Sequence, residues 1–574
     1  MVEYSKAHRW LPVGVLHAMS DRVLITGNLH SPPCPPSGPI LNLLWHEAAQ
    51  TEQFASTSPD VIVAASRRTK PPSDSMKVNQ FLGHYGVTDN PFAEEDAQSD
   101  RVFQSHCLKG VHHAAWDKIY GNPATPATSV VFGEQGSGKT ALRLQIIDKL
   151  AEYNSQNPTI RAFVLQYDDF NPFLDCFRER LSGSRRKPEK ALQNWKLWDH
   201  MDAILSLAVT RLSDIIRNNG TDPNDASAKI TPDALDQLTR PQKRDLLLLA
   251  TIYDQNRSLA PLLRWQQLRS KLKFNSWGRF LGPLYATLAM AAVLGVAYWK
   301  GEGWGGLANK WAIGLALACW LPFAWYQLRL FWGAWRIKGQ VRVVDHTVPV
   351  LRSLLSKFNA TELLDQPVPR ASRGDDRYEM LIKLQALLKT LGFSSVVVLM
   401  DRVDEPHLIN GSPERMRDLI WPLFDNKFLK HPGLAFKLLL PSVVSGFLQK
   451  EEKEFYERSR LDKQNLIRDL SWSGQGLYDI ANDRVRACAK LSEKPISIRD
   501  FFAPTITDPD LINIFDKLRA PRHLFKFLYR VVVDHCSKYT DEKPNWQIQP
   551  ETLQATLALF LRDLESIDRK TGIG

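Results

Sequence analysis

The chain has 574 residues, 44% of them hydrophobic, and a formal net charge of +11 at neutral pH. This length is sufficient for roughly two to four domains with a sizeable core. The six cysteines form no C-x-x-C pair, which argues against a disulfide framework or a zinc cluster and suits a reducing compartment. The positive excess is compatible with nucleic acid or an anionic membrane as a partner and does not separate the two.

Residues 1–75 differ in composition from the rest of the chain. They hold 9 of the 35 prolines, including the run "SPPCPPSGP" at Ser31–Pro39, and no helical or strand period persists across them. We predict that this stretch is mostly disordered. A plainer alternative is that it is not translated and that the protein begins at Met76, where the ordered-looking sequence "MKVNQFLGHYGVTDNPF" starts.

The next two segments are an N-terminal lead-in, residues 76–128, and the first half of an α/β core, residues 129–275. The periodicity of apolar residues predicts a helix in the lead-in and alternating strands and helices in the core. The predicted elements are a helix near Val111–Ile119, a strand at Ser129–Phe132, a strand at Ile160–Phe170, and helices of a helical insertion at Ala191–Asn218 and Lys243–Gln255.

The sequence "GEQGSGKT" connects the first predicted strand to the helix that follows it and matches the pattern G-x-x-x-x-G-K-[ST]. Glycines let the backbone wrap closely around phosphate groups, and the positive end of the following helix also favours them. We expect Lys139 to reach the outer phosphates and Thr140 to bind Mg²⁺. The predicted nucleotide-binding residues of this loop are Gly133, Glu134, Gln135, Gly136, Ser137, Gly138, Lys139 and Thr140.

Two apolar segments of membrane length lie within residues 276–337. Phe280–Trp299 and Trp311–Leu328 contain no charged residue, and tryptophan and tyrosine lie near their ends, as in an aromatic belt. A hydrocarbon core of about 30 Å is spanned by about 20 helical residues. We predict a two-helix transmembrane hairpin; the alternative is a helical hairpin buried in a large soluble core.

Basic residues outside this hairpin predict its orientation. The turn between the two segments carries Lys300 and Lys310 against Glu302. The positive-inside rule therefore places both outer flanks, and with them both halves of the core, on the cytoplasmic side. The basic residues of the two flanks are Arg264, Arg269, Lys271, Lys273, Arg279, Arg329, Arg336, Lys338 and Arg342.

Residues 338–470 are predicted to complete the α/β core. Ser394–Met400 is a continuous apolar run, which is typical of a central parallel strand. Asp401 follows at the end of this run, where a carboxylate can hold Mg²⁺. Asp404 and Glu405 come next, and either acid could orient or activate water.

Together, the glycine loop, the acidic strand end and the parallel-strand pattern resemble P-loop ATPases of the AAA+ and STAND group. The sequence "DRVDE" is similar to the "DGLDE"-type strand end of STAND proteins, with Arg402 in place of the small residue. The lead-in "HYGVTDNPF" (His84–Phe92) is similar to that of secretion-type AAA+ ATPases. A pair of membrane helices between the two nucleotide motifs resembles the KAP family of membrane-inserted P-loop NTPases, whose acidic motif is usually different.

The resemblance implies a P-loop NTPase fold: a parallel sheet flanked by helices, an inserted transmembrane hairpin, and a C-terminal helical lid over residues 471–574. It also implies a polar phosphate sensor at Ser442 and a second sensor at Arg522. Arg458 and Arg460 are candidates for an arginine finger, which the family usually takes from a neighbouring subunit, so a homo-oligomer is expected.

We therefore predict a membrane-tethered, ATP-binding protein, with Mg²⁺ as cofactor, that hydrolyses ATP to drive a conformational cycle at the cytoplasmic membrane face. The motifs predict catalytic roles for Lys139, Asp404 and Glu405, and the resemblance implies one for Arg522. One alternative is a nucleotide-gated switch or scaffold with little hydrolysis, because Arg402 stands beside Asp401. Another is a DNA-engaged or defence-type ATPase, supported by the net charge and the group resemblance alone. The protein client is not predicted.

Overall fold

The computed structural model describes residues 76–571 with internal gaps. The predictions for residues 1–75, disordered or untranslated, lie outside the described residues. The gaps are residues 223–224, 226, 257–258, 276–280, 301–309, 365, 370, 425–426, 460, 462–464 and 491–494.

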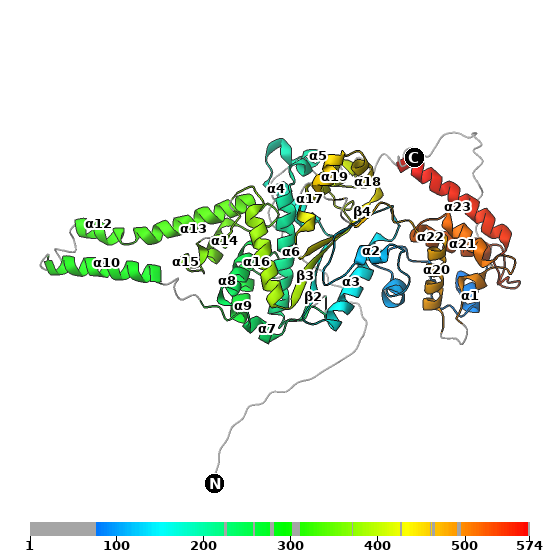
Figure 1. The fold of residues 1–574 in the computed structure, drawn as a ribbon, viewed down its shortest axis with the longest axis horizontal. Helices are drawn as coiled ribbons and strands as arrows, with labels where there is room; N and C mark the ends of the chain where they lie inside the picture. Colours follow the sequence, from blue (N-terminus) through cyan, green and yellow to red (C-terminus); the bar gives the residue numbers. More distant parts are fainter. Residues whose placement is uncertain are drawn as a thin grey trace, which may run out of the picture. The chain divides into compact units, whose positions relative to one another are not determined.

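The centre of the fold is a five-stranded, all-parallel sheet with the strand order β2-β3-β4-β1-β5. Figure 1 labels β2, β3 and β4 of this sheet. Two strands precede the apolar helix pair and three follow it, so two separated lengths of chain build one sheet, as predicted. Most strand residues are buried, as expected for a parallel sheet that is covered on both faces. The strands are β1 (Ser129–Gly133), β2 (Arg161–Tyr167), β3 (Phe393–Met400), β4 (Leu434–Pro441) and β5 (Asn465–Ile467).

Alternate residues of a strand point to opposite faces of the sheet. Both faces carry buried apolar residues here, and helices cover both. Val131 and Val397 pack with helices α2 (Trp116–Tyr120) and α3 (Lys139–Gln156) on one face. Val130 and Val398 belong to the larger core on the other face. The helices of that face include α4 (Asn171–Arg180), α6 (Leu197–Arg217), α8 (Arg240–Tyr253), α9 (Pro261–Lys271), α14 (Val348–Leu355), α16 (Asp375–Thr390) and α17 (Pro413–Phe424).

The C-terminal part of the chain is helical, as predicted, and forms a core of its own with the lead-in. Phe81 and Leu82 of helix α1 (Val78–His84) and Phe92 are buried in this core. The lead-in and the C-terminal helices therefore share one hydrophobic cluster, although they lie at opposite ends of the described chain. The C-terminal helices are α20 (Gly474–Cys488), α21 (Asp508–Asp516), α22 (Pro521–Cys536) and α23 (Pro550–Thr571).

The first apolar segment forms helix α10 (Leu281–Lys300), and the second forms α12 (Lys310–Ala318) and the beginning of the helix after it. Helix α10 lies alongside α12 (Figure 1). By length and composition, α10 could cross a membrane; α12 and α13 (Leu321–Gln340) could do so if they count as one bent span. Only 6% of the apolar window of α10 is buried. The pair is thus not the buried core hairpin of the alternative interpretation. Its large exposed side chains include Leu284, Tyr285, Leu288, Trp299, Trp311, Leu317, Trp325 and Trp332.

The second apolar segment is not one straight helix. The chain bends by 41° between α12 and α13. Pro322 lies in the first turn of α13, and proline has no backbone N–H to donate to a preceding carbonyl and clashes with a continuing helix. The helix predicted near Val111–Ile119 is also shorter than expected, because α2 begins only at Trp116.

Two arginines join the end of α13 to helices of the sheet. Arg180 of α4 donates to the carbonyl oxygens of Lys338 (2.5 Å) and Val344 (2.8 Å). Arg377 of α16 donates to the carbonyl oxygen of Gln340 (3.1 Å). Guanidinium groups near a helix C-terminus satisfy carbonyls that lack helical partners. The apolar pair is therefore anchored to helices that directly follow β2 and precede β3.

Candidate nucleotide-binding site

The glycine loop, residues 133–140, is the turn between β1 and α3, as the sequence predicts. Gly136 and Gly138 adopt φ angles of 87° and 95°, a left-handed region that glycine enters without steric cost. A Cβ atom on Gly136 would lie 2.7 Å from the Cβ atom of Arg522. The loop conformation and its close packing therefore both require glycine here.

Lys139 begins α3 and folds back onto the loop. Its Nζ donates to the carbonyl oxygens of Gly133 (2.8 Å) and Glu134 (2.9 Å). Burial lowers the pKa of Lys139, while the carboxylates of Asp401 and Asp404 act in the opposite direction. An anionic ligand at the loop would offer this amine stronger acceptors than two backbone carbonyls.

Thr140 and Asp401 meet where the sequence predicts a metal site. The Thr140 hydroxyl donates to Asp401 Oδ2 over 3.0 Å, and Asp401 is buried directly after β3. A hydroxyl and a carboxylate are the oxygen ligands that Mg²⁺ prefers. Within the described chain, no group of three His, Cys, Asp or Glu residues could hold a metal. The Thr140 hydroxyl and the Asp401 carboxylate fit two ligand positions of Mg²⁺, and phosphate oxygens and water would take the other positions.

Two charged residues that the sequence reasoning missed adjoin this pair. Arg143 forms an ion pair with Asp168, and its Nε lies 3.6 Å from Asp401 Oδ2. The side chain of Arg143 is only 2% exposed. Arg143 lies three residues after Thr140 on α3, so a search for polar residues at helical spacing behind the loop would have found it.

Asp404 and Glu405 both line the pocket beside the glycine loop. Arg402 adopts a φ of 58°, and its Nε lies 3.5 Å from Glu405 Oε1. Partial burial raises the pKa of Glu405, nearby Asp404 and Asp401 add to this, and Arg402 opposes it. Both acids therefore lie near the loop. Glu405 also forms an ion pair with Arg402, the residue at which this sequence departs from the pattern that it resembles.

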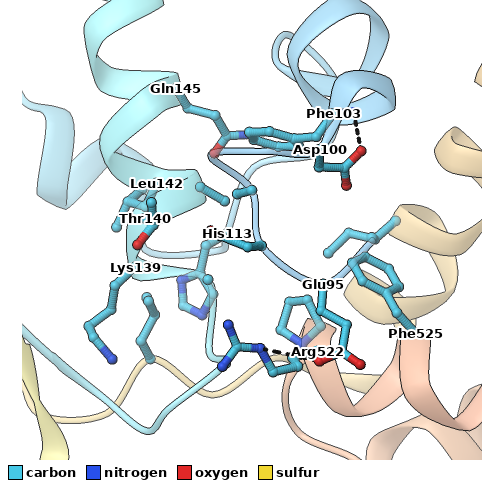
Figure 2. A pocket seen from close by; sticks show the side chains of 18 of the residues that line it. Glu95, Asp100, Phe103, His113, Lys139, Thr140, Leu142, Gln145, Arg522 and Phe525 are labelled. Carbon is cyan, nitrogen blue, oxygen red and sulfur yellow. Dashed lines mark hydrogen bonds and ion pairs between the residues drawn. The ribbon is translucent and has the colours of Figure 1, made fainter. Parts of the chain in front are cut away.

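Arg522, the expected second sensor, lies directly at the loop. Its backbone N–H donates to the Gly136 carbonyl (3.3 Å), and its Nε is 4.0 Å from Glu95 Oε2. Lys526, one turn later on α22, is 3.2 Å from the same carboxylate oxygen. Figure 2 shows Lys139 and Thr140 on one side of the pocket, Glu95 on the other, and the Arg522 guanidinium between them.

Ser442, the expected phosphate sensor, is not brought into this pocket. It begins α18 (Ser442–Gln449) one residue after Pro441, which is in register with Gly133. It therefore lies at the same edge of the sheet, but it is not among the described residues that line the pocket. The two candidates for an arginine finger cannot be placed, because the Arg458 side chain and Arg460 lie outside the described residues.

Beyond the loop the pocket has an apolar end that no motif predicted. Its walls come from the lead-in and from the C-terminal helices, which the shared core of these two segments brings together. Trp472 donates its Nε1–H to the Ser137 carbonyl (2.9 Å) and lies edge-on to the His113 ring, at 4.9 Å between centroids. The apolar and aromatic lining includes Phe103, Cys107, Val111, His113, Leu142, Trp472, Ile480 and Phe525.

Buried polar contacts hold the lead-in against this end of the pocket. Arg484 of α20 pairs with Asp100 over 2.5 Å and donates to the Pro91 carbonyl over 2.6 Å. The backbone N–H of Val111 donates to Asp483 Oδ2 (3.1 Å). Contacts from α20 thus hold the "NPF" stretch that carried the family resemblance, and they fix the pocket-lining residue Asp100 that follows it.

The arrangement as a whole is a pocket at the carboxyl ends of parallel strands, which is where open α/β sheets bind ligands. One end carries a glycine loop, a lysine and a hydroxyl–carboxylate pair, and the other end is apolar and aromatic. No family model matches the chain, and neither curated proteins nor solved structures contain a significantly similar protein.

Proposed function

We propose that the protein binds ATP with Mg²⁺ in this pocket and hydrolyses it while it is attached to a membrane. The observation that carries the proposal is the glycine loop between β1 and α3, with Thr140 hydrogen-bonded to Asp401 at the end of β3. Triphosphate oxygens suit the loop and Lys139, and a base suits the apolar end of the pocket.

In this proposal Thr140 and Asp401 would hold Mg²⁺, and the ion would neutralise part of the charge on the phosphates. Lys139 exchanges its two backbone carbonyl acceptors for phosphate oxygens. Arg522 already lies against the loop at Gly136, so its guanidinium needs little movement to contact a phosphate. These three interactions bind and orient the triphosphate, and orientation and charge stabilisation supply most of the catalysis in phosphoryl transfer.

A second function, a nucleotide-gated switch with slow hydrolysis, is supported by Arg402. Its contact with Glu405 (3.5 Å) is an ion pair, and this arginine reduces the basicity that partial burial gives to the Glu405 carboxylate. Measured turnover separates the two functions, because a switch would bind ATP tightly and release little phosphate.

Membrane attachment is supported by the exposed apolar surface of α10, α12 and α13, because soluble monomers seldom expose contiguous apolar surface of this kind. We propose that α10 and the bent α12–α13 pair cross the bilayer, with both basic flanks and the nucleotide site on the cytoplasmic side. A cysteine placed at Gly305 should then react with an impermeant thiol reagent from outside intact cells. Reaction only after lysis would contradict this topology. The predicted homo-oligomer remains a proposal.

The test of ATP binding is Lys139→Ala in full-length protein reconstituted in lipid nanodiscs. Loss of a charge-assisted contact should weaken ATP binding by about 10- to 100-fold, measured by titration calorimetry. Lys149→Ala is the matched control, because Lys149 is on the same helix but exposed and paired with Glu152. Equal ATP affinity in wild type and a folded Lys139→Ala variant would remove the proposal.

A further inference from the structure

Arg143 is placed between two carboxylates that follow two different strands. Asp168 comes directly after β2, and Asp401 comes directly after β3. Arg143 Nη1 pairs with Asp168, while Nε lies 3.6 Å from Asp401 Oδ2. The same Asp401 oxygen accepts the Thr140 hydrogen bond at 3.0 Å. One carboxylate oxygen thus faces both the hydroxyl that would bind a metal and a fixed positive charge.

The contact between Arg143 and Asp401 is buried but is not a hydrogen bond. Both side chains are 2% exposed, so solvent screens their attraction little. Arg143 Nε has no hydrogen-bond partner among the described residues. An ionic contact without a directional bond holds Asp401 near Thr140 and still leaves its carboxylate able to turn toward a ligand.

We propose that Arg143 is a built-in counter-ion of Asp401: it positions this carboxylate and competes with Mg²⁺ for it. This inference rests on the proposed function and adds a regulator of the same site. A cation bound by Thr140 and Asp401 would lie close to the guanidinium, and like charges in a buried site repel. Without metal, the same guanidinium reduces the repulsion between Asp401 and the phosphates. Arg143 therefore makes ATP binding less dependent on Mg²⁺.

The test measures the dissociation constant of ATP for the full-length protein in nanodiscs, once with excess Mg²⁺ and once with EDTA. The informative quantity is the ratio of the two constants, EDTA over Mg²⁺. Arg143→Gln should raise this ratio about tenfold, equivalent to about 1.4 kcal/mol. Arg143→Lys should return it toward the wild-type value, because the charge is kept.

Asp168→Asn should lower the ratio, because the guanidinium loses its other partner and is left to Asp401 alone. The two variants thus move the Mg²⁺ dependence in opposite directions. A purely structural role for the Arg143–Asp168 pair would move it in the same direction or not at all. Arg161→Gln is the matched control: Arg161 is a buried arginine of β2 that donates to the Leu391 carbonyl, and its loss should leave the ratio unchanged.

An unchanged ratio in folded Arg143→Gln and Asp168→Asn would overturn the inference while ATP binding stands. If Arg143→Gln does not fold, Asp168→Asn decides alone, and an unchanged or raised ratio in that variant overturns the inference. If the wild type binds no ATP in either buffer, the proposed function and this inference both fail. Thermal melting of each variant identifies those that fold.

Discussion

Two buried arginine–aspartate pairs differ in how completely their polar atoms are satisfied. Arg377 and Asp202 are both fully buried and are joined by two hydrogen bonds, of 2.9 and 2.8 Å. Tyr253 donates a further hydrogen bond to Asp202 (2.8 Å). By contrast, Arg143 approaches Asp401 only to 3.6 Å and leaves its Nε without a hydrogen bond among the described residues. The other acceptors of the Arg377 guanidinium are the carbonyl oxygens of Gln340, Ala371 and Arg373.

This difference separates a structural role from a functional one. A buried charge network with every donor paired is rigid, and it joins the end of the apolar pair to α6, α8 and α16. A buried pair that leaves an N–H group without a hydrogen bond has a free-energy cost, and a ligand that accepts from this group can offset that cost. We expect variants of the first pair to affect folding and variants of the second to affect ligand binding.

The largest effect is expected for Arg377→Met. It leaves Asp202 as a buried carboxylate without its cation, which should lower the free energy of unfolding by about 3–5 kcal/mol. The free energy of unfolding is measured by urea titration, with tryptophan fluorescence as the signal. The control is Arg240→Met, because Arg240 pairs with Glu362 but is 63% exposed, and such pairs contribute about 0–1 kcal/mol. Equal losses in the two variants would contradict the structural role of the buried pair.

Asp404→Asn and Glu405→Gln should affect turnover rather than stability. Whichever acid orients or activates water should lose about 100-fold or more in ATP turnover and keep its ATP affinity. Phosphate release and calorimetric binding measure the two quantities separately. If both variants hydrolyse ATP at the wild-type rate, neither acid is the base. An increase in turnover on Arg402→Gly would favour the interpretation that this arginine restrains Glu405.

A smaller effect is expected from pH, through His200, which precedes Asp202 by two residues on α6. Its Nε2 contacts the Leu419 carbonyl at 2.7 Å, and burial lowers the pKa of His200 to about 4. Unfolded histidine has a pKa of about 6.5, so the unfolded state binds the proton first as pH falls. The stability linked to His200 is therefore complete above about pH 6.5 and is lost between there and about pH 4.

From pH 7 to pH 5 this loss should amount to about 2 kcal/mol, measured by urea unfolding at both values. The His200→Gln variant should show a correspondingly smaller change between the two pH values. If the free energy of unfolding changes by the same amount between pH 7 and pH 5 in wild type and in His200→Gln, His200 is not the source of the pH dependence.

Much of the core could be predicted from local sequence. Apolar runs identified β1, β2 and β3, because strands buried on both faces need continuous apolar residues. The three-residue strand β5 carries too short a pattern to be found this way. The bend at Pro322 was also missed, although proline is a local signal, because apolar content alone had defined the segment.

The sequence by itself determined the residues whose chemistry is local: the glycine loop, Lys139 and Thr140 are adjacent in the chain and need only a strand before them and a helix after them. It also indicated Asp401, through the apolar strand that precedes it. Only the tertiary structure decided which distant residues meet at the site: it places Asp168 and Asp401 against Arg143, and it brings the lead-in and the C-terminal helices together at the apolar end of the pocket. It likewise left Ser442 outside. These placements depend on strand order and on packing between segments hundreds of residues apart, and no local pattern of residue types records such contacts.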